Sequence, residues 1–236
     1  MTKSFGGITA LRDVDFFVDQ GQIVGLIGPN GAGKTTLFNL ISRVYPPTSG
    51  MIRFEERVMT GLRPYQVCRL GISRTFQLTK SFNNMTVAEN IMVGALFGRE
   101  NQDNLKNARE KAYTLMEFAG LAEKADLPAS ELIQVDARRL ELVRALAANP
   151  KMLLLDEVMA GLNPSDIVEA SKLVRRIRDQ MGITVLMVEH IMSSVMTISD
   201  RVIVLANGEK ICDGTPQKVC DDPAVIDAYL GEAEEE

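Results

Sequence analysis

Cysteine is scarce in this chain, and the few cysteines present form no recognisable set. Cys68, Cys212 and Cys220 are odd in number and have none of the spacings by which cysteines hold a metal. A chain without a disulfide framework fits the reducing environment of the cytosol. We therefore expect neither a disulfide-stapled secreted domain nor a cysteine metal centre.

Long apolar runs and an excess of basic residues are missing as well. No apolar stretch reaches the ~20 residues that span a bilayer, and the polar start Met-Thr-Lys-Ser-Phe-Gly-Gly does not predict a signal peptide. The chain has 26 lysines and arginines against 31 aspartates and glutamates, with no basic stripe. Nucleic acid is therefore not an expected partner. A role at a membrane would require another chain to hold this one there.

Strand and helix patterns alternate along the 236 residues, a length that fits one large α/β domain or a core with a smaller lobe. The apolar runs at 23–27, 152–155 and 184–188 predict buried strands. An Asn-Gly pair inside residues 201–212 predicts a hairpin with a type I′ turn.

The helices are predicted from apolar periodicity and from their starting residues. Residues 78–135 carry no strong strand signal and predict a helical insertion, interrupted near 98–103. Residues 136–148 predict a further helix. Residues 164–180 predict another, with Asn163 as its N-cap and a proline in its first position.

The most specific motif is Gly-Pro-Asn-Gly-Ala-Gly-Lys-Thr-Thr, which has the phosphate-binding form G-x-x-x-x-G-K-T between a strand and a helix. The lysine suits the β- and γ-phosphates, and the first threonine hydroxyl is placed to ligate Mg²⁺. The alternative, a glycine-rich turn with a surface lysine, does not account for this context. The predicted nucleotide-binding residues are Gly28, Pro29, Asn30, Gly31, Ala32, Gly33, Lys34, Thr35 and Thr36.

Further candidates stand at the ends of other strands. Asp156 and Glu157 follow the strand at 152–155, where open α/β sheets bind their ligands. Asp156 would hold Mg²⁺, and Glu157 would polarise the water that attacks the γ-phosphate. His190, the only histidine, ends the next buried strand and could reach the γ-phosphate. Gln77 ends a strand-like segment and could reach the metal or the water. Taken singly, each could be a solvated or structural side chain.

These motifs together resemble the ATP-binding cassette (ABC) superfamily over essentially the whole chain. In that family, Gly28–Thr36 matches Walker A, Gln77 the Q-loop, residues 153–157 Walker B, Gly161–Pro164 the D-loop, and His190 the switch histidine. Phe5 falls where the family places an aromatic that stacks on adenine. The resemblance implies an α/β fold: a P-loop NTPase core with a mainly parallel sheet, a small antiparallel β lobe and a helical insertion. We expect one nucleotide-binding domain over residues 1–236, with a helical subdomain at 78–135 and a flexible acidic tail at 232–236.

Short segments, including Arg74-Thr75-Phe76-Gln77 and the ending Ala228–Glu232, resemble ATPase subunits of branched-chain amino-acid importers. This implies ATP and Mg²⁺ as ligands, a second ABC ATPase subunit, integral-membrane permease subunits and, indirectly, an extracytoplasmic solute-binding protein. The chain would lie in the cytoplasm, attached to the inner face of the cell membrane. The loop after Gln77 would pass motion to the permease through Leu78, Lys80, Ser81, Phe82 and Met85. Alternatives are an exporter ATPase of the lipopolysaccharide type, or a nucleotide-sensing module with little turnover.

The segment that should match the family signature, close to L-S-G-G-Q, departs from it. Here Ile133, Gln134, Val135 and Asp136 follow Leu132. In the family this segment holds the γ-phosphate bound to the partner subunit, but here the serine and both glycines are absent. Asp136 would put a negative charge near phosphate or cap the following helix. The chain is either a weakened half-site in a heterodimer with an intact partner, or a variant that uses backbone N–H groups and Gln134.

A second departure is Val158 after Glu157, where the family usually has proline, and we expect little chemical effect from it. A further oddity concerns the start of the chain. The family normally has a strand before Lys3-Ser4-Phe5, and here only two residues precede the lysine. Either the lobe lacks its first strand or the chain starts late.

Overall fold

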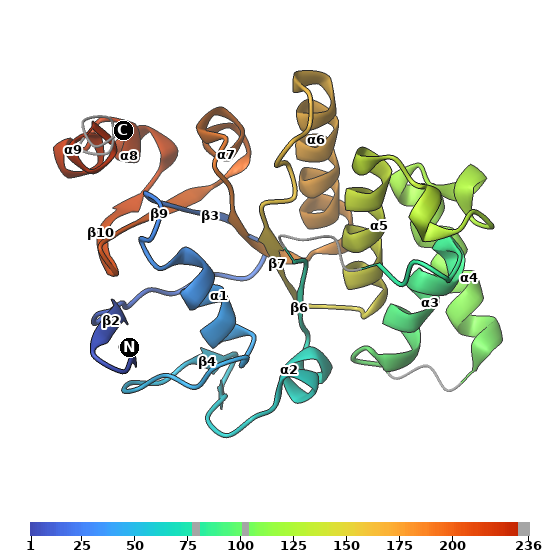
Figure 1. The fold of residues 1–236 in the computed structure, drawn as a ribbon, viewed down its shortest axis with the longest axis horizontal. Coiled ribbons are helices and arrows are strands. Elements are labelled where there is room, and N and C mark those ends of the chain that lie inside the picture. The colour runs from blue at the N-terminus through green and yellow to red at the C-terminus, as the bar shows by residue number, and fades with distance from the viewer. Residues whose placement is uncertain (77–80, 101–103, 231–236) are drawn as a thin grey trace.

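The computed structural model describes residues 1–76, 81–100 and 104–230, and a six-stranded sheet runs through the centre of these residues (Figure 1). Five strands run parallel and the edge strand β10 is antiparallel to its neighbour. The predicted mainly parallel sheet is confirmed. In spatial order the strands are β10 (Glu209–Gly214), β9 (Arg201–Ala206), β3 (Ile23–Ile27), β8 (Thr184–Val188), β7 (Met152–Asp156) and β6 (Ile72–Arg74).

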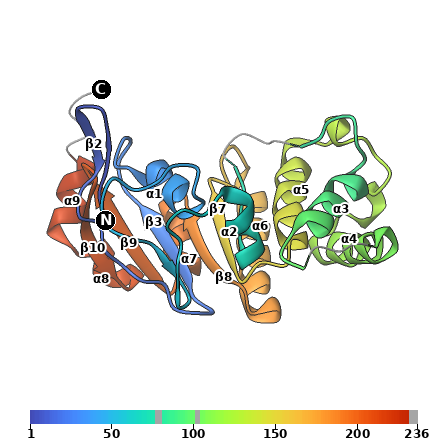
Figure 2. The same cartoon turned by 90° about the horizontal axis from the view of Figure 1, so that it is seen from below.

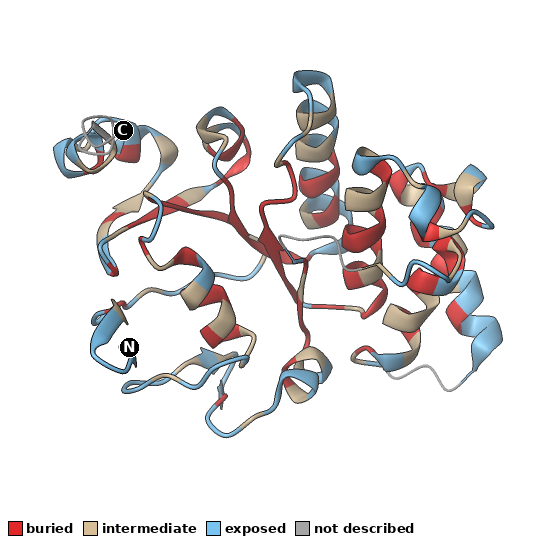
Figure 3. Ribbon diagram, in the orientation of Figure 1, coloured by how far each residue is buried: buried red, intermediate tan, exposed pale blue. Residues whose placement is uncertain are grey.

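Alternation along the central strands explains why both faces of the sheet are covered. In β7, Leu153 and Leu155 belong to one hydrophobic cluster, whereas Leu154 belongs to the other. Successive side chains of a strand point to opposite faces, so a strand that is apolar throughout needs a layer on each side. Helix α1 (Lys34–Ile41) lies in the second cluster, and α6 (Pro164–Met181) and α7 (Met192–Ile198) contribute to the first. Figure 3 shows the buried residues gathered along this sheet.

A group of helices lies at one end of the molecule, beside the β6 edge of the sheet (Figure 2). Gly94 permits a close contact within this group, because a Cβ there would stand 2.2 Å from the carbonyl oxygen of Arg144. The group contains α3 (Val87–Phe97), α4 (Leu105–Ala119), two short 3-10 turns (Ala122–Lys124 and Ala129–Glu131) and α5 (Gln134–Ala147). The prediction that α5 starts at residue 136 is wrong by two residues, because the helix already begins at Gln134 with Ile133 as its N-cap.

Two short antiparallel pairs lie on the α1 side of the sheet: β1 (Lys3–Phe5) with β2 (Ile8–Leu11), and β4 (Arg53–Phe54) with β5 (Arg57–Val58). Neither β1 nor the helices α2 (Pro64–Leu70), α8 (Pro216–Cys220) and α9 (Pro223–Leu230) were predicted. The predicted hairpin turn is confirmed, because both Asn207 and Gly208 have positive φ, as a type I′ turn requires. Within the described part of the chain, no helix combines the length and apolar character needed to cross a bilayer.

Candidate nucleotide-binding site

The loop between β3 and α1 has a shape that only glycine permits at two positions. Gly28 has φ 150°, and a Cβ there would lie 2.0 Å from the carbonyl oxygen of Leu205 on β9. Gly33 has φ 100°, and its Cβ would lie 2.5 Å from a methyl group of Leu11 on β2. The loop is therefore clamped between the sheet and the β1–β2 pair. Successive backbone N–H groups in such a turn, followed by a helix N-terminus, make a concave anion site.

Lys34 occupies this concavity. Its side chain is buried, and its Nζ donates to the carbonyl oxygens of Gly28 at 2.5 Å and Pro29 at 2.8 Å. An ammonium group folded over its own loop is poised for acceptors of higher charge, such as phosphate oxygens. Thr35 follows on the first turn of α1 and is exposed. The cradle and its cation fit a triphosphate.

The carboxyl ends of β3, β8 and β7 are level, which brings the other candidates to the same edge. Asp156 pairs in register with Val188, and Val188 with Leu26. Asp156 is therefore level with Leu26, just before the P-loop and two strands away. Glu157 comes directly after β7, and His190 follows the end of β8 with Glu189 between them. Parallel strands deliver their last residues to one crevice.

The side chains of Glu157 and His190 form a hydrogen bond. The ring Nε2 of His190 lies 2.8 Å from Oε1 of Glu157, and the Glu157 N–H donates to the Val188 carbonyl at 2.9 Å. Glu157 has φ 52°, a backbone conformation that is unfavourable for a residue with a side chain. Strain of this kind survives where surrounding contacts fix it, often at functional sites. The arrangement orients a buried carboxylate beside an imidazole at the site edge.

Glu189 is a buried acid that the sequence analysis did not single out. Burial, which disfavours the charged carboxylate, raises its pKa to about 7, with the Met159 N–H opposing the rise and the nearby Glu157 adding to it. Its Oε1 accepts from the Met159 N–H at 2.9 Å. Glu189 therefore fixes the loop that follows Glu157. Its position between a buried strand and His190 was the only available signal.

Arg74, at the end of β6, was also missed as a site residue. Its Nη2 lies 2.7 Å from Oδ2 of Asp156, and both side chains are buried. The signal was a charged residue at the end of a strand, inside the segment that leads to Gln77. Gln77 itself lies outside the described residues.

The donor set at this edge suits a hard cation. Thr35 offers a hydroxyl and Asp156 a carboxylate, the oxygen ligands that Mg²⁺ prefers. Among the residues that the structure describes, no group of three or more His, Cys, Asp and Glu side chains could hold a metal. A magnesium ion here would therefore take its remaining ligands from phosphate and water, its usual mode of binding.

The altered signature segment lies at the start of α5. The prediction that Asp136 caps the following helix is wrong for this chain, because Ile133 is the N-cap of α5 and Asp136 lies in its first turn. The carboxylate is buried and pairs with Lys124, and its Oδ1 lies 3.5 Å from Arg139. Gln134 is exposed and its Nε2 reaches the Ala160 carbonyl, in the D-loop region of the same chain, at 3.5 Å.

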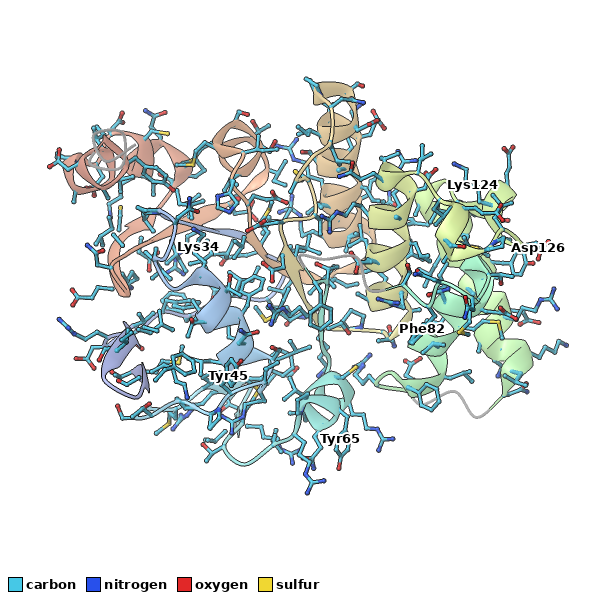
Figure 4. All side chains as sticks on the ribbon, viewed as in Figure 1. Lys34, Tyr45, Tyr65, Phe82, Lys124 and Asp126 are labelled. Atoms are coloured by element: carbon cyan, nitrogen blue, oxygen red, sulfur yellow. The ribbon has the colours of Figure 1, made fainter. Side chains whose placement is uncertain are left out.

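This segment is remote from the P-loop of its own chain. Figure 4 shows Lys34 on one side of the molecule and Lys124, the partner of Asp136, on the opposite side. Phe82 is labelled on the Lys124 side too and is 47 % exposed, so it is not a plain core residue. Its ring lies 5.4 Å from the Arg144 guanidinium.

Phe5 ends β1 and is 42 % exposed. Its ring meets Tyr45 edge to face at 5.4 Å, and Lys3 Nζ lies 4.7 Å from its centroid. The ring is accessible enough to stack on a base.

A large cavity of about 1250 Å³ lies elsewhere. Residues at the starts of three strands, Ile72, Met152 and Thr184, contribute to its walls. The cavity therefore lies at the amino ends of the parallel strands, whereas Asp156 and His190 lie at their carboxyl ends. None of the predicted nucleotide-binding residues lines it. Cavity size alone would have pointed to the wrong end of the sheet.

Comparison with known proteins gives the family that this chain resembles. The family described as "ABC transporter" matches residues 11–160, and the family described as "Branched-chain amino acid ATP-binding cassette transporter" matches residues 209–235. The high-affinity branched-chain amino acid transport ATP-binding protein LivG of Salmonella typhimurium is 42% identical over 241 residues, covering 97% of this chain and 94% of that protein. The corresponding protein BraF of Pseudomonas aeruginosa is 39% identical, covering 99% and 96%.

Solved structures give the same result. A nucleotide-free ATP-binding cassette from an ABC transporter superposes with a TM-score of 0.88 at 32% identity, covering 97% of this chain and 95% of that one. A cassette in its ADP conformation gives 0.87 at 33% identity, covering 98% and 96%. A dimeric bacterial ABC transporter cassette gives 0.82 at 25% identity, covering 91% and 96%.

Proposed function

This chain belongs to the ATP-binding cassette transporter family, among the branched-chain amino-acid transport ATP-binding proteins, and we propose that its ATP hydrolysis drives the import of branched-chain amino acids. The observation that carries the proposal is the meeting of four strand ends: the P-loop after β3, Arg74 on β6, Asp156 and Glu157 after β7, and His190 after β8. The exporter and nucleotide-sensing alternatives are not favoured, because the relatives at 39–42% identity are high-affinity branched-chain amino acid transport ATP-binding proteins.

ATP is the proposed substrate, held mainly by backbone and by Lys34. The P-loop N–H groups and the N-terminus of α1 would surround the phosphates, while Lys34 would exchange its carbonyl partners for β- and γ-phosphate oxygens. Thr35, Asp156 and Gln77 would hold Mg²⁺, which when bound neutralises charge on the phosphate oxygens. The Phe5 ring would stack on adenine.

Glu157 is the proposed acceptor of a proton from the water that attacks the γ-phosphate. His190, bonded to Oε1, would fix the direction of that carboxylate and reach the phosphoryl group as charge develops there. The positive charge of Lys34 would stabilise the same transition state.

A second cassette is the proposed partner, because this chain's signature segment cannot serve its own P-loop (Figure 4). Two chains arranged head to tail would bring each α5 N-terminus to the other's phosphates. Asp136 in the first turn of α5 reduces the attraction of that helix end for an anion, since its negative charge already faces the helix dipole. We infer that this chain supplies the weaker signature of a heterodimer and that its own P-loop site is completed by a partner with an intact one.

Integral-membrane permease subunits complete the proposed assembly, with an extracytoplasmic solute-binding protein acting through them and the cassette lying at the cytoplasmic face. Exposed Phe82, followed by Met85, would contact the permease; Leu78 and Lys80 of the same predicted loop lie outside the described residues.

Uptake of radiolabelled leucine into vesicles tests the proposal. Vesicles that contain the permease pair, the partner ATPase and this chain should accumulate leucine when ATP is inside and the binding protein is outside. Vesicles with the Lys34→Ala variant should not. Normal uptake without this chain, or ATP hydrolysis that leucine and its binding protein never stimulate, would contradict the assignment.

A further inference from the structure

The guanidinium of Arg74 lies between the two elements that carry the proposed magnesium ligands. It extends from the end of β6, and its side chain is 7% exposed. On one side it meets Asp156, at the end of β7. On the other it meets α1, the helix that begins with Lys34 and Thr35.

Towards β7, residues 74 and 75 hold Asp156 at two points. Arg74 Nη2 lies 2.7 Å from Oδ2 of Asp156, and the Asp156 N–H donates to the Thr75 hydroxyl at 3.0 Å. The link to the carboxylate runs from one nitrogen to one oxygen rather than as a two-pronged pair. Arg74 Nε, although buried, has no hydrogen-bond partner among the described residues. Arg74 therefore leaves Oδ1 of Asp156 to another ligand.

Towards α1, the guanidinium is anchored by two polar groups and one ring. Nη1 donates to Asn39 Oδ1 at 2.7 Å and to the Ser42 hydroxyl at 3.1 Å, and the centroid of Phe38 lies 5.5 Å away. Phe76 approaches at 5.2 Å. Cation–π contacts and bonds from separate nitrogens fix a planar guanidinium in position and orientation.

The helical repeat of α1 relates the anchor residue Asn39 to the proposed metal ligand Thr35. Asn39 stands four residues after Thr35, so the two lie one turn apart on the same face of α1. A group that joins Asn39 to Asp156 therefore sets the separation between the Thr35 hydroxyl and the Asp156 carboxylate.

We propose that Arg74 is the positioning residue for the metal-binding carboxylate of Asp156. By tying Asp156 Oδ2 to the α1 turn below Thr35, it fixes the separation of two of the side chains that would hold Mg²⁺. The proposal rests on the proposed function of this site as an Mg²⁺–ATP site. Partners that orient metal ligands from outside the coordination shell typically alter metal affinity by about 10–100-fold when removed.

Equilibrium binding of a fluorescent ATP analogue, measured with EDTA and then across a magnesium titration, tests the role. Arg74→Met should keep the affinity measured in EDTA and require about tenfold more Mg²⁺ to reach half of the magnesium-dependent gain. Arg74→Lys keeps the charge but not the planar fork, and should lose most of the same gain. Arg201→Met removes an arginine from another aspartate pair, on the β9–β10 hairpin, and should behave like the parent.

The outcomes separate the two levels of the proposal. A parent protein without any magnesium-dependent gain would overturn the proposed function and the role of Arg74 with it. A parent with the gain and an Arg74→Met variant that retains it would overturn the role of Arg74 alone. So would an Arg74→Lys variant equal to the parent, because charge alone would then suffice, or equal losses with and without Mg²⁺.

Asn39→Ala keeps the inference testable if Arg74→Met does not fold. It removes the anchor on α1 while leaving the Asp156 carboxylate paired with Arg74. We expect a severalfold higher magnesium requirement with unchanged affinity in EDTA; an unchanged magnesium requirement would contradict the proposal.

Discussion

The chemistry at the scale of single residues depends on a few carboxylates held in fixed directions. Glu157 keeps an unfavourable φ because its N–H bonds to Val188 and its carboxylate to His190. A water-polarising group needs such a fixed direction more than it needs charge alone.

Glu157→Gln should preserve ATP binding and lower the rate of hydrolysis by about a hundredfold or more, because an amide cannot accept the proton of the attacking water. Phosphate release measures the rate, and size-exclusion chromatography with ATP should show a trapped dimer, with any required partner cassette present. Glu117→Gln, an exposed change on α4, is the control. Parental hydrolysis in the Glu157 variant would remove the proton-accepting role.

Glu189 links pH to stability. Its pKa is raised from 4.5 to about 7 by burial, so the folded chain keeps a proton between those values that the unfolded chain has lost. The free energy of unfolding therefore receives a contribution that falls as pH rises from about 4.5 to 7 and is constant above it. At about 1.4 kcal/mol per pH unit, this amounts to roughly 3 kcal/mol at most.

Glu189→Gln should abolish that slope, because an amide does not titrate yet still offers an oxygen to the Met159 N–H. Urea unfolding at pH 5, 6, 7 and 8 measures this slope: relative to the parent, the variant should gain stability from pH 5 to pH 7 and level off by pH 8. Glu117→Gln should run parallel to the parent. A Glu189 variant that also runs parallel would show that this carboxyl is ionised throughout.

At the scale of secondary-structure elements, capped helix ends fix the loops beside the site. Helix α6 follows the D-loop, and its start is fixed by the Asn163 side chain, whose oxygen accepts from the Asp166 N–H at 3.0 Å. The preceding Gly161 has φ 75° and lies against Gln134 of the signature segment. The cap thus anchors a loop that reaches the neighbouring motif.

Asn163→Ala should lower the free energy of unfolding by about 1 kcal/mol, the usual cost of losing an N-cap acceptor. Asn163→Ser, which keeps a capping oxygen, should recover most of it. Thermal and urea unfolding of the pair measure the difference. Equal stabilities of the alanine and serine variants would mean that packing, not the cap, starts α6.

At the scale of the whole molecule, the proposed assembly requires each chain to contribute half of two different sites. Lys34 lies on the opposite side of the molecule from Lys124, which pairs with Asp136 of the signature segment (Figure 4). The buried Asp136 carboxylate also forms an ion pair with Arg139. A site completed by another chain makes turnover depend on which chain that is.

The purified homodimer should therefore hydrolyse ATP slowly, and a partner cassette with an intact signature should raise the rate about tenfold or more, since each hydrogen bond to a charged group contributes about 1.5–3 kcal/mol. The double variant Ile133→Ser, Gln134→Gly should raise the rate of the homodimer by restoring part of the signature. Steady-state ATPase assays measure both. A fast, cooperative parental homodimer would contradict the heterodimer.

Local pattern alone predicted most strands of the central sheet correctly. The strand at 184–188, the Asn163 cap and the 207–208 turn were predicted correctly because each depends on neighbouring residues: apolar runs, a capping side chain and positive φ. The start of α5 was misplaced because aspartate is a common N-cap residue. In the folded chain Asp136 is instead buried in the first turn of the helix, where it pairs with Lys124. No local signal distinguishes these cases.

The order of the chain therefore determines the P-loop, its lysine and the acids at the strand ends, because glycine conformations and apolar runs act over a few residues. Tertiary structure alone decides that Arg74 pairs with Asp156 from β6, that Glu189 is buried enough to keep a proton near neutrality, and that Lys124, the partner of Asp136, lies on the opposite side of the molecule from Lys34. Strand order joins residues about 80 positions apart, such as Arg74 and Asp156. Burial lowers the polarity around a carboxyl group and so disfavours its charged form.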